Sequence, residues 1–158
     1  MELIMLGTGN AMVTRCYNTC FVLSSGEEYF LVDAGGGKLE QAGVPFTGIR
    51  EMFVTHAHTD HILGAIWVIR KIATLMSSDK YRRNFIVYGH NEVIDALRTF
   101  CRLTLPGKIL KYIDERIFWG EVKDGTRKEI LGLPICFFDI LSTKMKQFGF
   151  RVLLPDGQ

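Results

Sequence analysis

The length, composition and charge of the chain are those of one water-soluble globular domain. Its 158 residues are enough to bury a sizeable core, and 47% of them are hydrophobic, with a mean hydropathy of +0.13. No apolar run approaches the ~18 residues of a membrane span, and no basic segment of the signal-peptide type opens the chain. The formal net charge of +2 is too small to indicate nucleic-acid binding. These features exclude a membrane protein and predict a single cytoplasmic domain, residues 1–158.

The first part of the chain is predicted to form strands followed by a helix. Runs rich in β-branched and aromatic residues predict four strands, at residues 2–7, 19–24, 28–35 and 49–56. Ser25-Gly26 predicts a turn between the second and third strands, and the glycine-rich segment 35–43 predicts one or two helical turns. From Ile62 to Met76 the apolar residues recur with the spacing of one helix face, which predicts a well-buried helix.

The rest of the chain is predicted to contain one more helix and four more strands. Asn91 is a suitable N-cap for a helix that ends near Leu103, before Pro106-Gly107. Asp124-Gly125 predicts a turn between strands. The strands are predicted at residues 84–90, 115–123, 132–141 and 148–155. Together these elements indicate a mixed α/β (α+β) domain.

The last eight residues, "RVLLPDGQ", run from an apolar strand into Pro-Asp-Gly, which is typical of a tight reversal. A strand that returns from this turn does not follow. We therefore expect the domain to be incomplete at its C-terminus. The alternative is a natural domain that ends on a frayed turn.

The segment "THAHTDH", residues 55–61, contains three of the four histidines of the chain and an aspartate. Alternate residues of a strand share a side, so His56 and His58 can reach one metal ion as the chain leaves the sheet. Asp60 and His61 follow at the start of the helix and can reach a second ion, because carboxylate and imidazole both bind zinc or manganese. The helix N-terminus also favours anionic groups. The alternative is a polar loop without metal.

The residues around this motif resemble a known family. The HAHTDH segment, 56–61, is similar to the HxHxDH signature of the metallo-β-lactamase superfamily. Asp33 in "LVDAGGG" matches the buried aspartate at a strand end in that superfamily, and the strand and helix on either side of the motif agree as well. Residues 5–23 further resemble the first hairpin of ribonuclease Z and its relatives. The resemblance covers residues 1 to about 90 well and 115–158 loosely.

The resemblance implies a metallo-β-lactamase-type αββα sandwich of four layers, of which this chain forms the first part. It implies two Zn²⁺ ions, with Mn²⁺ or Fe as alternatives, one held by His56 and His58 and the other by Asp60 and His61. A water between the ions is deprotonated and attacks a phosphodiester, ester or amide, and Asp60 acts as a catalytic residue that orients this nucleophile. Asp33 fixes the motif loop without binding metal.

Part of the family pattern is missing. No histidine follows His90, which we expect to be an exposed loop residue or a substrate-side residue and not a ligand. In the segment 137–150, Leu141 stands where relatives often have a histidine. The bridging aspartate and the last histidine of the family fall beyond Gln158. Because a catalytic zinc has three protein ligands, we expect residues 1–158 alone to bind zinc weakly and to hydrolyse phosphodiesters no faster than zinc in buffer.

Three hypotheses about the protein follow from the sequence. The first is a metal-dependent hydrolase of the ribonuclease Z type, acting on phosphodiesters such as RNA or a cyclic nucleotide, of which this chain is a part that is inactive alone. The second is a non-catalytic or truncated relative that acts as a binding or oligomerising module. The third is a homodimer in which two chains cover each other's sheets. The apolar residues that the missing half would leave bare are Ile135, Phe137, Phe148 and Val152.

Overall fold

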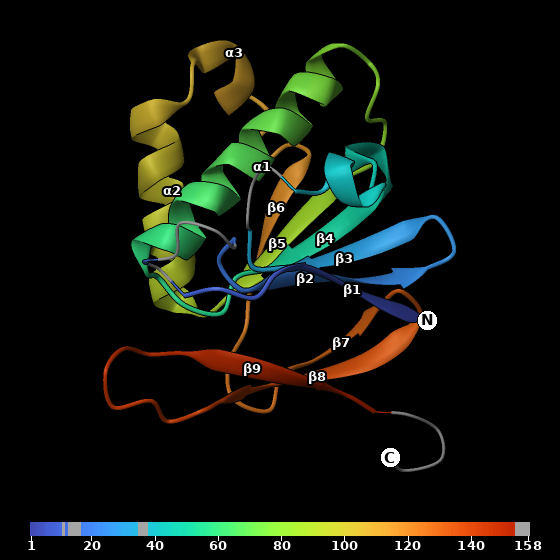
Figure 1. Ribbon diagram of the computed structural model, residues 1–158. Helices are drawn as coiled ribbons and strands as arrows, with labels where there is room; N and C mark the ends of the chain where they lie inside the picture. The colour runs from blue at the N-terminus through green and yellow to red at the C-terminus, as the bar shows by residue number, and fades with distance from the viewer. Residues whose placement is uncertain (11, 13–16, 35–37, 154–158) are drawn as a thin grey trace.

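The computed structural model describes residues 1–10, 12, 17–34 and 38–153. Figure 1 shows three layers: helices, a large sheet and a small sheet. The large sheet has the order β1-β2-β3-β4-β5-β6 and the small sheet the order β7-β8-β9. The strands of the large sheet are β1 (Glu2–Gly7), β2 (Cys20–Ser25), β3 (Glu28–Val32), β4 (Ile49–Phe53), β5 (Phe85–Gly89) and β6 (Ile117–Glu121). Those of the small sheet are β7 (Arg127–Ile130), β8 (Leu133–Asp139) and β9 (Phe148–Val152).

The helices α1 (Thr59–Ser77), α2 (Asn91–Thr104) and the short α3 (Gly107–Leu110) lie on one face of the large sheet (Figure 1). Two 3₁₀ turns, η1 (Glu40–Ala42) and η2 (Phe46–Gly48), precede β4. Strand β2 is antiparallel to both of its neighbours, β1 and β3, whereas β3, β4, β5 and β6 are parallel to one another. Parallel strands need crossover connections, which α1 and α2 provide. The carboxyl ends of β3, β4 and β5 therefore meet at one edge of the sheet.

A first core fills the space between the helices and the large sheet. The predicted periodicity of α1 is confirmed, because the residues with helical spacing between Ile62 and Met76 are buried against the sheet. Each such isoleucine contributes ~1.5–3 kcal/mol when fully buried. Gly64 is required in this helix, since a Cβ there would overlap the carbonyl oxygen of Ala34, which follows β3. The close approach sets the first turn of α1 directly against the carboxyl end of β3.

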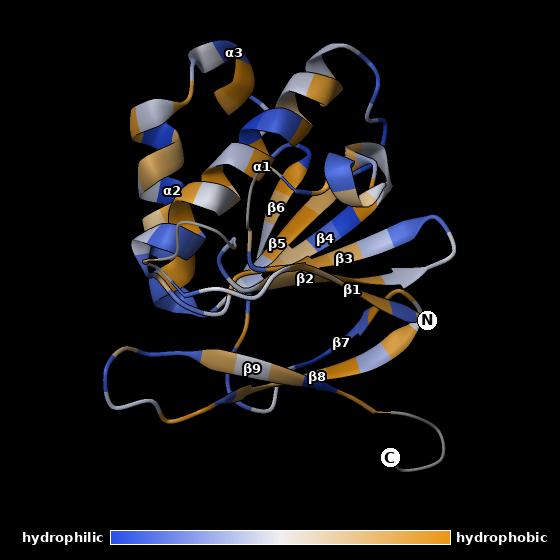
Figure 2. Ribbon diagram, in the orientation of Figure 1, coloured by the Kyte–Doolittle hydropathy of each residue, from blue (hydrophilic) through white to orange (hydrophobic). Residues whose placement is uncertain are grey.

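A second, largely aromatic core lies between the two sheets, whose facing surfaces carry hydrophobic residues (Figure 2). The ring centroids of Phe53 and Phe137 are 4.9 Å apart. The expectation of bare apolar residues is wrong here: Ile135 is 1% exposed, Phe137 0% and Phe148 4%, and Val152 is half-buried. The large sheet covers them, because its second face is apolar too. These residues therefore provide no reason for a homodimer, which stays a prediction.

The small sheet takes the place of the second half of the expected four-layer sandwich. Within the described ranges, no helix covers its outer face, so three of the four expected layers are present (Figure 1). Strand β7 and helix α3 were not predicted from the sequence. Residues 35–37 of the glycine-rich segment that was predicted to form helical turns, and the predicted turn at 155–157, lie outside the described residues. In the described part of the chain, no helix is long and apolar enough to cross a bilayer.

Candidate metal centre

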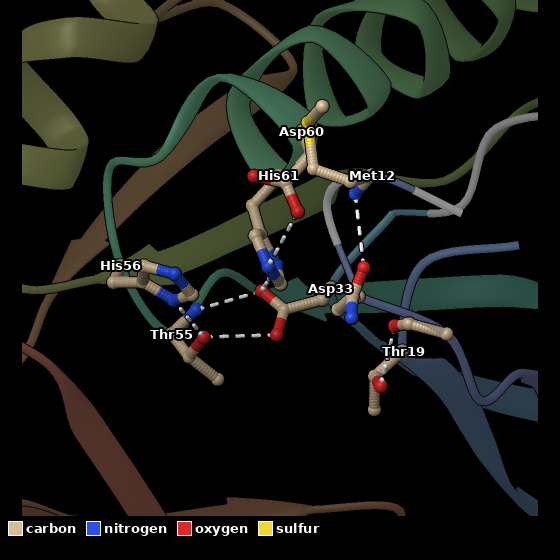
Figure 3. Close-up of polar contacts among 9 residues, drawn as sticks. Met12, Thr19, Asp33, Thr55, His56, Asp60 and His61 are labelled. Carbon is tan, nitrogen blue, oxygen red and sulfur yellow. Dashed lines mark hydrogen bonds and ion pairs between the residues drawn. The ribbon is translucent and has the colours of Figure 1, made fainter.

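The predicted site residues come together at the carboxyl edge of β3 and β4 (Figure 3). Asp33 is the first residue after β3, and its backbone N–H donates to the carbonyl oxygen of Phe53, the last residue of β4. Its φ of 52° is left-handed, a conformation that aspartate tolerates better than most residues. The chain leaves β4 through Thr55 and enters α1 at Thr59. Neighbouring parallel strands thus place the aspartate beside the histidine loop.

The carboxylate of Asp33 ties this loop to the sheet. Its Oδ1 accepts a hydrogen bond from the backbone N–H of Thr55 at 2.9 Å, and its Oδ2 accepts one from Thr55 Oγ1, also at 2.9 Å. Oδ1 also lies 3.1 Å from Nδ1 of His61. Asp33 is only 6% exposed, so these charge-assisted bonds are weakly screened by solvent. Three donors around one buried carboxylate fix both ends of the loop.

Hydrogen bonding selects the tautomer of His56. The Thr55 hydroxyl has one proton, which it donates to Asp33, so it accepts a hydrogen bond from Nδ1 of His56, 2.8 Å away. The lone pair of the neutral ring is then on Nε2, the nitrogen that a metal would use. Burial, followed by the neighbouring His61, lowers the pKa of His56 and favours this neutral form. The chain Asp33–Thr55–His56 therefore prepares one imidazole as a ligand.

His61 lies between two carboxylates (Figure 3). Its Nδ1 faces Asp33, and its Nε2 is 3.4 Å from Oδ2 of Asp60. Burial acts to lower the pKa of His61, but the hydrogen bond and charge of Asp33 and the charge of Asp60 outweigh it, and the pKa is raised. When Nδ1–H of the neutral His61 ring donates to Asp33, the lone pair of Nε2 faces an oxygen of Asp60. These two acceptors repel each other unless a proton or a cation lies between them.

The spacing of these two atoms fits a shared metal ion. Ligand atoms 2.0–2.2 Å from a tetrahedral zinc lie roughly 3.3–3.6 Å apart, which includes the 3.4 Å between His61 and Asp60. The ring centroid of His56 is 4.6 Å from that of His58 and 4.2 Å from that of His61. The structure therefore brings all four predicted ligands into one cluster. Within the part of the chain that the structure describes, no group of three His, Cys, Asp or Glu side chains could hold an ion by itself.

The cluster opens into a cleft of about 1240 Å³. One wall comes from the connection between β1 and β2, where the carbonyl oxygen of Gly9 accepts hydrogen bonds from both the backbone N–H and the hydroxyl of Thr19. The first turn of α1 contributes Thr59 and Leu63 to the lining. Polar groups and the N-terminus of a 19-residue helix thus face the same space, an environment suited to an anionic group.

Two other predicted positions lie away from the cluster. His90 was expected to be exposed, and this is wrong: it is 0% exposed at the end of β5, because β9 packs over it with the Phe148 ring centroid 5.4 Å away. Burial lowers its pKa, and neither ring nitrogen has a hydrogen-bond partner in the described structure. Leu141, the position that relatives were expected to fill with histidine, is 82% exposed with φ of 54°. Neither residue lines the cleft.

The part that the connection between β8 and β9 takes in the cleft was not foreseen. Gln147, in the connection between β8 and β9, lines the cleft together with the histidine loop. A single glutamine in a loop has no distinguishing spacing, so no pattern in the sequence would have identified it. Its place depends on the packing of the small sheet against the large one.

Known proteins resemble this chain in sequence and in structure. A family model described as "Anti-Pycsar protein Apyc1" matches residues 1–101. Ribonuclease Z of Listeria monocytogenes serovar 1/2a is 27% identical to this chain in an alignment 168 residues long, which covers 100% of this chain and 51% of the relative. An Anti-Pycsar protein Apyc1 of Paenibacillus xerothermodurans is 34% identical over 67 residues, 40% of this chain and 27% of the relative. The chain spans about half the length of the ribonuclease Z relatives it matches.

Solved structures resemble the fold. Human tRNase Z, short form, superposes with a TM-score of 0.69 at 19% identity, over 96% of this chain and 64% of that chain. The metallo-β-lactamase fold protein YhfI of Bacillus subtilis superposes with a TM-score of 0.67 at 17% identity, over 95% of this chain and 57% of that chain. The two-sheet architecture of the chain is the fold of these metallo-β-lactamase fold proteins. Because the family model spans well over half of the 158 residues, the chain belongs to the family described as Anti-Pycsar protein Apyc1.

Proposed function

We propose that the protein is a metal-dependent hydrolase that cleaves phosphodiesters. The observation that carries this proposal is the chain of contacts from Asp33 through His61 to Asp60. A carboxylate that holds the Nδ1 side of an imidazole while the Nε2 side faces a second carboxylate is the arrangement by which proteins orient a metal-binding histidine. A module that binds its partners without metal has no need of such a buried polar network.

The four loop residues have distinct roles in this proposal. His56 and His58 hold one divalent ion, and Asp60 and His61 hold the other; zinc is the first choice, with manganese or iron as alternatives. When bound, the ions supply a lowered pKa for a water molecule and neutralise charge on a phosphoryl group. Asp60, 3.4 Å from His61, orients the attacking water through its carboxylate. Asp33 holds the loop and binds no metal.

The substrate class follows from the site and from the relatives. Ribonuclease Z and tRNase Z, by their names, act on RNA, whose backbone consists of phosphodiesters. In this chain the N-terminus of α1 and polar groups around Gly9 and Thr19 face the cleft and suit an anionic substrate. RNA and cyclic nucleotides both present this chemistry, and a cytoplasmic location belongs to the same proposal.

The test uses the protein in which these 158 residues occur naturally, loaded with Zn²⁺ or Mn²⁺. Activated aryl phosphodiesters, a short RNA and a cyclic nucleotide are supplied, and His58→Ala provides the matched inactive variant. We expect metal-dependent hydrolysis that His58→Ala reduces to the level of free metal, while residues 1–158 alone remain near that level. A metal-loaded natural protein that cleaves none of the three substrates would contradict the proposal.

A further inference from the structure

The connection between β8 and β9 lies against the histidine loop and is held there on both sides of Gln147. The backbone N–H of Phe148 donates to the carbonyl oxygen of Thr55 at 3.0 Å, one residue before His56. The carbonyl oxygen of Gln147 accepts from the backbone N–H of Ile140 at 3.1 Å, which closes the connection on itself. These two bonds place the backbone of Gln147 beside the start of the candidate metal-binding loop.

The neighbours of Gln147, Lys146 and Phe148, do not line the cleft and make contacts elsewhere. Lys146 Nζ donates to Oδ1 of Asn91, the first residue of α2, at 2.6 Å. Phe148 packs against His90, the residue between β5 and α2. Gln147, which lies between these two residues, is among the residues that line the cleft.

Among the described residues that line this cleft, Gln147 is the one that comes from beyond the N-terminal turn of α1. It carries a carboxamide, whose oxygen is a neutral acceptor that binds divalent ions, although oxygen ligands suit manganese better than they suit zinc. His56 and His58 supply only two ligands for their ion, whereas a stable site requires three or four.

We propose, on the basis of the metal positions proposed above, that Gln147 provides the third protein ligand to the ion held by His56 and His58. The carboxamide oxygen occupies a position from which an imidazole would bind zinc more tightly. The ion at this position is consequently held weakly and exchanges readily, with a preference shifted towards manganese relative to a site of three histidines.

Substitutions at Gln147 test this placement through metal affinity, without any assay of hydrolysis. Equilibrium binding of Zn²⁺ and Mn²⁺ to the 158-residue chain is measured by competition with a chromogenic chelator, and circular dichroism confirms that each variant is folded. We expect Gln147→His to raise the affinity for Zn²⁺ by roughly tenfold or more. We expect Gln147→Ala to weaken Mn²⁺ binding. Lys144→His is the matched control, since Lys144 belongs to the same connection but is exposed and does not line the cleft.

If the proposal is correct, the gain in Zn²⁺ affinity of Gln147→His depends on both His56 and His58. Adding His58→Ala to that variant should abolish the gain, because the new imidazole then shares its ion with one residue only. Unchanged Zn²⁺ affinity in Gln147→His, an equal gain in Lys144→His, or a gain that survives His58→Ala would each overturn the proposal. These outcomes are distinct from a failure of the proposed reaction, which appears as absence of hydrolysis and leaves metal affinities as they are.

Discussion

Replacing Asp33 by asparagine should disturb the metal centre more than its modest change in shape suggests. The three groups around this carboxylate are all donors: the N–H and the hydroxyl of Thr55, and Nδ1 of His61. An asparagine oxygen in the place of Oδ1 can accept from two of them, but the NH₂ group then faces the hydroxyl. That hydroxyl turns round, accepts from asparagine and donates to Nδ1 of His56, so the proton of His56 moves to Nε2 and the lone pair needed by a metal is lost.

The size of both effects can be worked out from these contacts. Hydrogen bonds to a charged group contribute about 1.5–3 kcal/mol, so weakening them lowers the free energy of unfolding by roughly that amount. Loss of an orienting partner lowers metal affinity by ~10–100-fold. Urea unfolding measures the first quantity, and competition with a chelator measures the second.

Asp79→Asn is the matched control for Asp33→Asn. Asp79 also has a left-handed backbone, with φ of 57° against 52° for Asp33, and it also has a basic partner, Arg82 at 2.8 Å. Its side chain is 73% exposed, however, and surface ion pairs contribute ~0–1 kcal/mol. Equal losses of stability in the two variants, or unchanged zinc affinity in Asp33→Asn, would refute the orienting role of Asp33.

Three further perturbations test tightly packed or buried positions of the chain. Gly64→Ala should lower the free energy of unfolding by about 1–3 kcal/mol, because its Cβ overlaps the carbonyl of Ala34, whereas Gly107→Ala, with open space around its Cβ, should be close to neutral in the same urea titration. Burial lowers the pKa of His90 from 6.5, so below about pH 6.5 the unfolded chain takes up a proton more readily than the native chain. The free energy of unfolding should therefore fall between pH 7.5 and 5.5, less steeply in His90→Phe; equal pH slopes would show that His90 does not titrate as described. Burial raises the pKa of Cys101 to about 12, so iodoacetamide at pH 8 should leave Cys101 unmodified in the folded chain and alkylate it in urea, as peptide mass spectrometry will show; rapid alkylation without urea would mean that the thiol is accessible.

The histidine loop and its surroundings were predictable because their signal is local. The strand before Thr55 and the helix after it are determined by short-range patterns, and four potential ligands within residues 56–61 leave few other arrangements. Asp33 could be placed because its segment, "LVDAGGG", resembles the one that carries the buried strand-end aspartate of the metallo-β-lactamase superfamily. The hydrogen bond that Nδ1 of His56 donates to the hydroxyl of Thr55 was not predictable, since it depends on the exact approach of two strand ends.

Features that depend on contacts between distant segments were missed or misjudged. The burial of His90 and the place of Gln147 in the cleft both depend on how β9 and the residues before it pack against the large sheet. Such contacts join distant parts of the chain: Lys146 and its partner Asn91 are 55 residues apart. A polar residue after a strand is exposed in most folds, so the burial of His90 has no trace in its immediate sequence. The same long-range packing covers Phe137, which the sequence alone suggested would be bare.

Strand β7 was missed because its residues, Arg127–Ile130, carry three charges and little β-propensity. It forms as the partner of β8 across a turn at Leu131 and Gly132, whose φ angles are 54° and 73°. Two successive residues with positive φ are typical of a type I′ hairpin turn, but leucine is not a residue that predicts one. Pairing with the apolar strand β8 therefore outweighs the low β-propensity of residues 127–130.

The most direct test of the metal centre is elemental analysis of the natural protein and two single variants after dialysis against a mild chelator. If His56 and His58 hold one ion and Asp60 and His61 the other, the natural protein should retain two divalent ions per chain. His58→Ala and His61→Ala should each lose one of them while circular dichroism remains unchanged. A natural protein that hydrolyses phosphodiesters without metal, or a variant that retains as much metal as the natural protein, would contradict the assignment of this loop.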